Sequence, residues 1–288
     1  MNAALGGMLA ALAWGSADFI ARFTGTALGH VSALFGMLVA SAVVLTALVL
    51  FMGLPVTGLA TAWWYLLLAG CGLTLATLLL YQGLVRGPVT VVAPIAGTFP
   101  AFNIVLALGL GLRPSVTEWA AMAAVMAGVF VVAQSARHYE TRGQYSRTHI
   151  RISVVIALAA SFLFAVTVAA AQEAGAICGE IQAVFLARWI SLACCVALLA
   201  ARGRVPVISL RWWPALAVQG ALDAGALLAV VAGSEDATSA ITAVLASTFS
   251  AVTVVLARVF IREAMSWGQW LGIAIILAGV ATLSGLQA

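Results

Sequence analysis

Two carboxylates stand inside stretches of this chain that are otherwise apolar and long enough to cross a membrane. Asp18 lies in segment 3–22, and Asp223 lies near the middle of segment 213–233. An ionisable group inside a membrane is costly, so it needs a partner, water or a function. Either carboxylate could bind a substrate ammonium group, carry a proton or pair with an arginine. For Asp18, Arg22 follows four residues later on the same helical face, and this spacing favours an ion pair within the helix.

One basic residue, Arg188, also falls inside an apolar segment, 181–201. Its planar guanidinium group suits a substrate carboxylate. Its long stem would equally let it reach the lipid headgroups, or pair with a carboxylate such as Glu173 or Glu180. On these grounds the sequence favours a structural role for Arg188 over substrate contact.

Aromatic and amide side chains could give a small ligand contact area and a few polar handles that orient it. Hydroxyl groups can bond to a ligand or hold helices together. The alternative for any one of these residues is packing between helices or against lipid. With Asp18 and Asp223, the candidate substrate-binding residues are Trp14, Tyr81, Gln82, Phe99, Asn103, Phe164 and Thr248.

Other chemistries find little support in the residue types present. The four cysteines form no CxxC pair, and no histidine stands near them to complete a zinc site. All 13 basic residues are arginine, so a phosphate-binding glycine loop with its lysine is excluded. We therefore expect no metal, no cofactor, no nucleic-acid partner and no enzymatic activity.

The composition explains which elements must position these residues. Of the 288 residues, 64% are hydrophobic and 8% are charged, whereas soluble domains carry roughly 25% charged residues. A membrane-spanning helix needs about 20 mostly apolar residues. The sequence thus predicts an all-α integral membrane protein with ten transmembrane helices. The predicted spans are 3–22, 31–52, 63–85, 88–112, 117–135, 151–171, 181–201, 213–233, 237–260 and 267–286.

Short matches recur in the same order in both halves of the chain with a nearly constant offset. They pair Trp63-Trp64 with Trp212-Trp213, Thr98-Phe99 with Thr248-Phe249, and Ala127-Gly128-Val129 with Ala278-Gly279-Val280. This indicates a first five-helix repeat in 1–136, a polar linker in 137–150 and a second five-helix repeat in 151–288. Because five is odd, the second repeat must be inverted, which is typical of transporters with a central site. Such a chain holds both halves of a transport path, so a monomer suffices.

Arginine is concentrated in the loops after odd-numbered spans, as at Arg86, Arg142 and Arg202, whereas the loops after even-numbered spans hold essentially Arg113 alone. The positive-inside rule then places the odd loops in the cytoplasm and both termini outside.

Three stretches resemble the drug/metabolite transporter (DMT) superfamily, EamA type. They are ALAWGSADFIARF (Ala11 to Phe23), GPVTVVAPIAGTFPAFNIVLALGL (Gly87 to Leu110) and FIREAMSWGQWLGIAIILAGV (Phe260 to Val280). Among family members the chain looks most similar to YddG-type bacterial amino-acid exporters. One departure is Arg113, where the family often has a glutamate that the second copy keeps as Glu263. The resemblance also implies cytoplasmic termini, opposite to the charge pattern.

The resemblance implies a multi-pass protein of the inner (plasma) membrane that exports amino acids or similar small polar metabolites. Transport would follow alternating access through a cavity between the repeats, with the bilayer and a small polar substrate as partners. Exporters of cationic drugs, nucleosides or nucleotide-sugars remain alternatives. An intramembrane enzyme would need a cluster of acid, base or nucleophile that the sequence does not offer.

Overall fold

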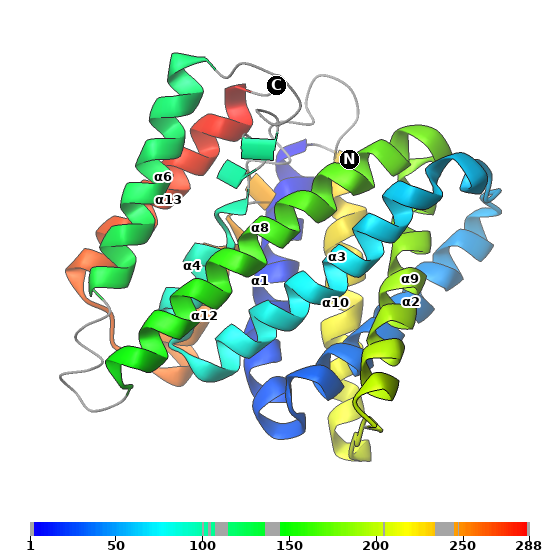
Figure 1. The fold of residues 1–288 in the computed structure, drawn as a ribbon, viewed down its shortest axis with the longest axis horizontal. Coiled ribbons are helices and arrows are strands. Elements are labelled where there is room, and N and C mark those ends of the chain that lie inside the picture. The colour runs from blue at the N-terminus through cyan, green and yellow to red at the C-terminus, as the bar shows by residue number, and fades with distance from the viewer. Residues whose placement is uncertain are drawn as a thin grey trace.

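The structure is a computed structural model that describes residues 3–99, 101–102, 105–106, 115–135, 145–203, 205–233, 245–246 and 248–286. All regular elements within these ranges are helical (Figure 1). In chain order they are α1 (Ala3–Leu28), α2 (His30–Met52), α3 (Leu59–Arg86), α4 (Val89–Ala96), α6 (Val116–Ser135), α8 (Arg147–Cys178), α9 (Glu180–Ala201), the 3-10 turn η1 (Leu210–Trp212), α10 (Trp213–Gly233), α12 (Phe249–Leu256), the π-helical turn η3 (Ala257–Ile261) and α13 (Trp267–Leu286).

Four of these helices, α2, α3, α8 and α9, are clearly long and apolar enough to cross a membrane. Their ends follow local chemistry. Helix α2 stops at Gly53, which adopts the left-handed conformation (φ 62°) and donates its N–H to Leu50 O; glycine takes that conformation without steric cost. Helix α8 starts after Ser146, whose hydroxyl accepts the backbone N–H of His149.

The helices of the two halves of the chain interlock in a symmetric pattern. Helix α1 packs on α10, and α8 packs on α3, while α2 and α9 contact each other. Helix α6 pairs with α13, and the short α4 lies against α12. Helix α1 begins and α13 ends at the same end of the molecule (Figure 1). Each helix of the first half thus has a counterpart in the second that packs in the equivalent way.

Helix lengths differ from the predicted spans in several places. Helix α1 continues to Leu28 and α8 to Cys178, because a helix does not need to end where its apolar run ends. The predicted span 88–112 is not one continuous helix, since α4 ends at Ala96. Pro94 lies inside α4 and lacks an N–H, and the N–H of Thr98 bonds the carbonyl of Ile95 in a tightened turn.

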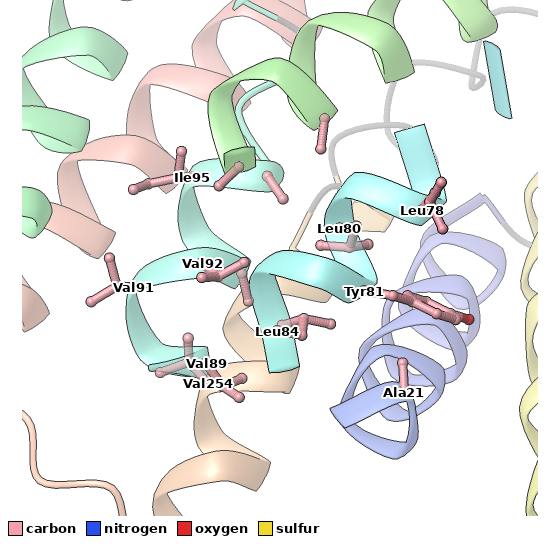
Figure 2. Close-up of a cluster of buried hydrophobic side chains, with 14 of the residues drawn as sticks. Ala21, Leu78, Leu80, Tyr81, Leu84, Val89, Val91, Val92, Ile95 and Val254 are labelled. Carbon is pink, nitrogen blue, oxygen red and sulfur yellow. The ribbon is translucent and has the colours of Figure 1, made fainter. Parts of the chain in front are cut away.

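The interior is aliphatic, and large apolar side chains also cover the outside. Figure 2 shows part of the buried core, to which α3 contributes Leu84, α4 contributes Val92 and α12 contributes Val254. On the outside, Phe51 is 91% exposed and Trp267 is 90% exposed. Apolar surface on this scale is what a lipid bilayer covers.

Candidate functional site

An ion pair joins two helices of the second half. Arg188 Nη2 of α9 lies 2.6 Å from Asp223 Oδ2 of α10, and it is the only ion pair among the residues that the structure describes. The side chain of Arg188 is 4% exposed and that of Asp223 is 19% exposed. The predicted pairing of Arg188 with Glu173 or Glu180 is therefore wrong, because its partner is Asp223. Those carboxylates lie on the surface of α8 and at the start of α9, whereas Arg188 is buried against α10.

Further polar groups join this pair to the first half of the chain. Ser41 Oγ of α2 donates to the same oxygen of Asp223 over 3.1 Å. One turn before Asp223, the amide of Gln219 donates to the hydroxyl of Tyr81 on α3, and its oxygen accepts from Thr24 Oγ1 of α1 at 3.0 Å. In Figure 2 the Tyr81 hydroxyl points away from the aliphatic side chains around the ring. Five helices thus contribute polar atoms to one region.

Asp18 of α1 also belongs to this region. Its carboxylate lies within electrostatic range of Asp223 and of the Tyr81 hydroxyl, and that hydroxyl also lies within range of Arg188. Asp18 is half-buried, and among the described residues its carboxylate makes no hydrogen bond or ion pair. We call Asp18, Tyr81, Arg188, Gln219 and Asp223 the central cluster. It carries one cation and two carboxylates within apolar helices.

The predicted ion pair between Asp18 and Arg22 is wrong. Arg22 Nη1 donates to the carbonyls of Leu84, Val85 and Gly87, and Nη2 donates to the hydroxyl of Tyr145. The last carbonyls of a helix lack partners within it and carry partial negative charge. The end of α3 therefore attracts the guanidinium group more strongly than a neighbour on α1 does.

Trp14 lies beside the central cluster without belonging to its hydrogen-bond network. Its ring meets that of Phe249 edge to face, with centroids 6.3 Å apart, and it packs against a small apolar group that includes Ala226. Trp14 is one helical turn from Asp18, and Ala226 is about one turn from Asp223. Trp14 and Phe249 thus form an apolar wall next to the charges.

Within the described residues, no hydrogen bond joins the other predicted site residues to the cluster. Thr248 Oγ1 bonds the carbonyl of Leu245 at 2.6 Å within its own turn, which is the local structural role. Phe164 packs on the aliphatic core. Gln82 and Phe99 are half-buried. Asn103 lies outside the residues that the structure describes. The structure therefore brings together Asp18, Tyr81 and Asp223 from the predicted set, with Trp14 adjoining.

Sequence reasoning missed Gln219 and assigned Arg188 a structural role. Gln219 precedes Asp223 by four residues, so both lie on one face of α10, and that spacing was a usable signal. Ser41 and Thr24 gave no such signal, because isolated hydroxyl residues are common in apolar helices. The partner of Arg188 lies on a different helix and could come only from the fold.

A second polar group surrounds the turn between α3 and α4. Both carboxylate oxygens of Glu263 accept hydrogen bonds there. Val89 N donates to Oε1 at 3.1 Å, while Thr90 N and Thr90 Oγ1 donate to Oε2 at 3.0 and 2.9 Å. Glu263 thus caps the start of α4, just as Arg22 covers the end of α3. We call Arg22 and Glu263 the turn-binding residues. Within the described ranges no group of three or more metal-binding side chains occurs.

Comparison with known proteins gives a family and a fold. The family model of the EamA-like transporter family matches residues 1–134 and 151–285. A solved structure titled only "Crystal structure of protein" is 19% identical over 99% of this chain and 96% of that chain, with a TM-score of 0.67. At that identity the likeness shows the fold alone. No curated protein matches the chain.

Proposed function

This chain belongs to the EamA-like transporter family, and we propose that it exports amino acids or similar small polar metabolites across the inner membrane. At the level of the family, the protein is a multi-pass membrane transporter of the DMT type that acts on a small molecule within a lipid environment, and it is not an enzyme. We further propose that its cargo, its direction of transport and its membrane are those of YddG-type exporters.

The central cluster is the observation that carries this proposal. Its charges lie within apolar helices, where an ionisable group needs a reason to be present. Arg188 and Asp223 satisfy each other in part, but Asp18 has no partner among the described residues. A pair alone would explain a structural cross-link. A second carboxylate and a tyrosine hydroxyl next to this ion pair are the polar groups expected in a binding site.

The place of the cluster in the fold supports alternating access. We propose that residues 1–136 and 151–288 are the two repeats, joined by the linker 137–150. Asp18 and Tyr81 come from the first repeat, whereas Arg188 and Asp223 come from the second. A cargo bound between them would contact both repeats. Rocking of one repeat against the other would then open the site to each side in turn.

A cationic drug remains the second candidate cargo. Asp18 next to the apolar wall of Trp14 is the observation that favours it, because a carboxylate among aromatic rings suits a lipophilic cation. Nucleotide-sugars would need several basic residues, and Arg188 is the one cation in the described part of the cluster.

Uptake into proteoliposomes tests the proposal. The purified protein is reconstituted, and a radiolabelled panel of amino acids is offered with and without an inward proton gradient. We expect saturable uptake that unlabelled amino acid competes away. Absence of uptake across the amino-acid panel, with saturable uptake of a cationic dye, would move the cargo to cations.

The same assay identifies a proton carrier if the gradient accelerates uptake. The two candidate carriers are Asp223 and Asp18, and Asp18 is the better placed because Asp223 already pairs with Arg188. Replacement of the carrier by asparagine should abolish the effect of the gradient. Glu173→Gln, which removes a carboxylate from the exposed surface of α8, is the matched control. Coupled transport that persists in both Asp18→Asn and Asp223→Asn would remove the carboxylates from the mechanism.

A further inference from the structure

Arg188 has more hydrogen-bond donors than the protein uses. Nη2 meets Asp223, but Nε and Nη1 are buried and find no acceptor within the described structure. A guanidinium group has five donor hydrogens, and buried donors are nearly always satisfied. The Arg188 side chain is only 4% exposed. Bulk water therefore does not supply the missing acceptors. Nη1 together with Nη2 also forms the end of the group that matches a carboxylate in shape.

Asp18 shows the opposite deficit. Its carboxylate oxygens accept no hydrogen bond from any described residue. The nearby negative charge of Asp223 also repels this carboxylate. Asp223 itself has two donors, Ser41 and Arg188. A donor group with positive charge placed next to Asp18 would remove both problems at once. The cluster therefore lacks one anion at Arg188 and one cation at Asp18.

We infer that the site is built for a zwitterion, with the cargo carboxylate on the free donors of Arg188 and the cargo ammonium on Asp18. This inference rests on the proposed function and narrows it to free α-amino acids. Their two charged groups are attached to one carbon, and the Tyr81 hydroxyl lies within electrostatic range of Asp18, Asp223 and Arg188. The short spacing of the cargo charges fits a cluster of this kind.

Singly charged cargo fits the cluster less well. A cation would satisfy Asp18 and leave the two donors of Arg188 unmet. An anion would satisfy Arg188, but it would add a third negative charge beside Asp18 and Asp223. The apolar wall of Trp14 and Phe249 adjoins Asp18, and it suits an apolar side chain. Leucine, methionine and phenylalanine are therefore the probes.

The test compares each probe with two analogues that lack one charge. The amide lacks the carboxylate, and the desamino acid lacks the ammonium group. All are measured as competitors of radiolabelled probe in proteoliposomes. For the native protein we expect both analogues to compete at least about tenfold less well than the amino acid, because each loses charge-assisted hydrogen bonds.

Two variants should change this ranking in opposite ways. In Asp18→Asn, the desamino acid should compete as well as the amino acid, because the partner of the ammonium is gone. In the double variant Arg188→Gln/Asp223→Asn, the amide should compete as well as the amino acid. The double variant removes both partners of the ion pair, so neither charge is left buried alone. Glu173→Gln should keep the native ranking.

The outcomes separate the inference from the proposed function. Transport of amino acids with a ranking that neither variant alters would overturn the zwitterion site and leave amino-acid export standing; ordered water would then satisfy Arg188. Equal competition by amide and amino acid in the native protein would also overturn it. Thermal unfolding shows whether the protein used is folded. If a folded protein transports none of the probes, amino-acid export itself is wrong.

Discussion

Charged residues of this transporter behave differently at the central cluster and at the turn between α3 and α4. The turn-binding residues Arg22 and Glu263 direct their charge to backbone groups, with Arg22 on the carbonyls that end α3 and Glu263 on the N–H groups that begin α4. In the central cluster, Arg188 keeps two unused donors and Asp18 keeps an unused carboxylate. Arg22 and Glu263 thus have protein partners for their charge, whereas Arg188 and Asp18 have groups without a partner in the described structure. Single unpartnered atoms also occur elsewhere, as at Arg86 and Gln269, but in the cluster a cation with unpartnered donors and an unpartnered carboxylate lie in one region.

The largest effect on stability should come from breaking the ion pair of the cluster on one side. Arg188→Gln leaves Asp223 as a largely buried carboxylate without its counter-charge, and such changes cost about 3–5 kcal/mol. The double variant Arg188→Gln/Asp223→Asn should recover most of that loss. Thermal unfolding in detergent measures both. Equal destabilisation of single and double variants would show that the pair is not the source of the cost.

A smaller effect should follow from separating the helices that align the cluster. A Cβ at Gly220 of α10 would lie 2.6 Å from the Cβ of Ala40 and 2.7 Å from Met37 O on α2. Gly220→Ala should therefore cost about 1–3 kcal/mol and weaken the bond from Ser41 to Asp223.

Gly225 on the same helix is the matched control, because a Cβ there meets nothing within 4 Å. Gly225→Ala should leave the melting temperature unchanged or raise it, since alanine favours helix by about 1 kcal/mol over glycine. If both alanine variants melt alike, close packing of α2 on α10 does not align the cluster.

At the turn, Glu263→Gln should cost about 1–2 kcal/mol, since the amide retains one acceptor but loses the charge that favours the start of a helix. Binding of cargo by the folded protein should not change, because Glu263 acts on backbone groups outside the cluster. A calorimetric melt and a binding assay on the same sample check both statements. Loss of binding at full stability would place Glu263 in the transport path.

The sequence allowed much of the helical framework to be predicted, because apolar length is a local property. The segments 181–201 and 213–233 match α9 and α10 almost residue for residue. The break after Ala96 was harder, since Pro94 is tolerated in helices and the turn depends on how the neighbouring chain packs. The predictions of which charged residues pair with each other were the least accurate. Arg22 lies four residues from Asp18 but bonds α3, and Arg188 finds Asp223 on another helix. Local spacing identifies possible partners, and only packing decides among them.

The smallest effect on stability is expected for Asp18→Asn, because no described group depends on that carboxylate. Its melting temperature should stay within about 2 °C of the native value, as for surface changes of up to 0.5 kcal/mol. A marked drop would mean that Asp18 has a structural partner.

Equilibrium binding to purified protein tests the central claim most directly. Radiolabelled leucine, methionine and phenylalanine are measured against the native protein, Asp18→Asn and Glu263→Gln in detergent. The account predicts binding that Asp18→Asn weakens at least about tenfold and that Glu263→Gln leaves intact. Binding that survives in Asp18→Asn and disappears in a folded Glu263→Gln protein would contradict it.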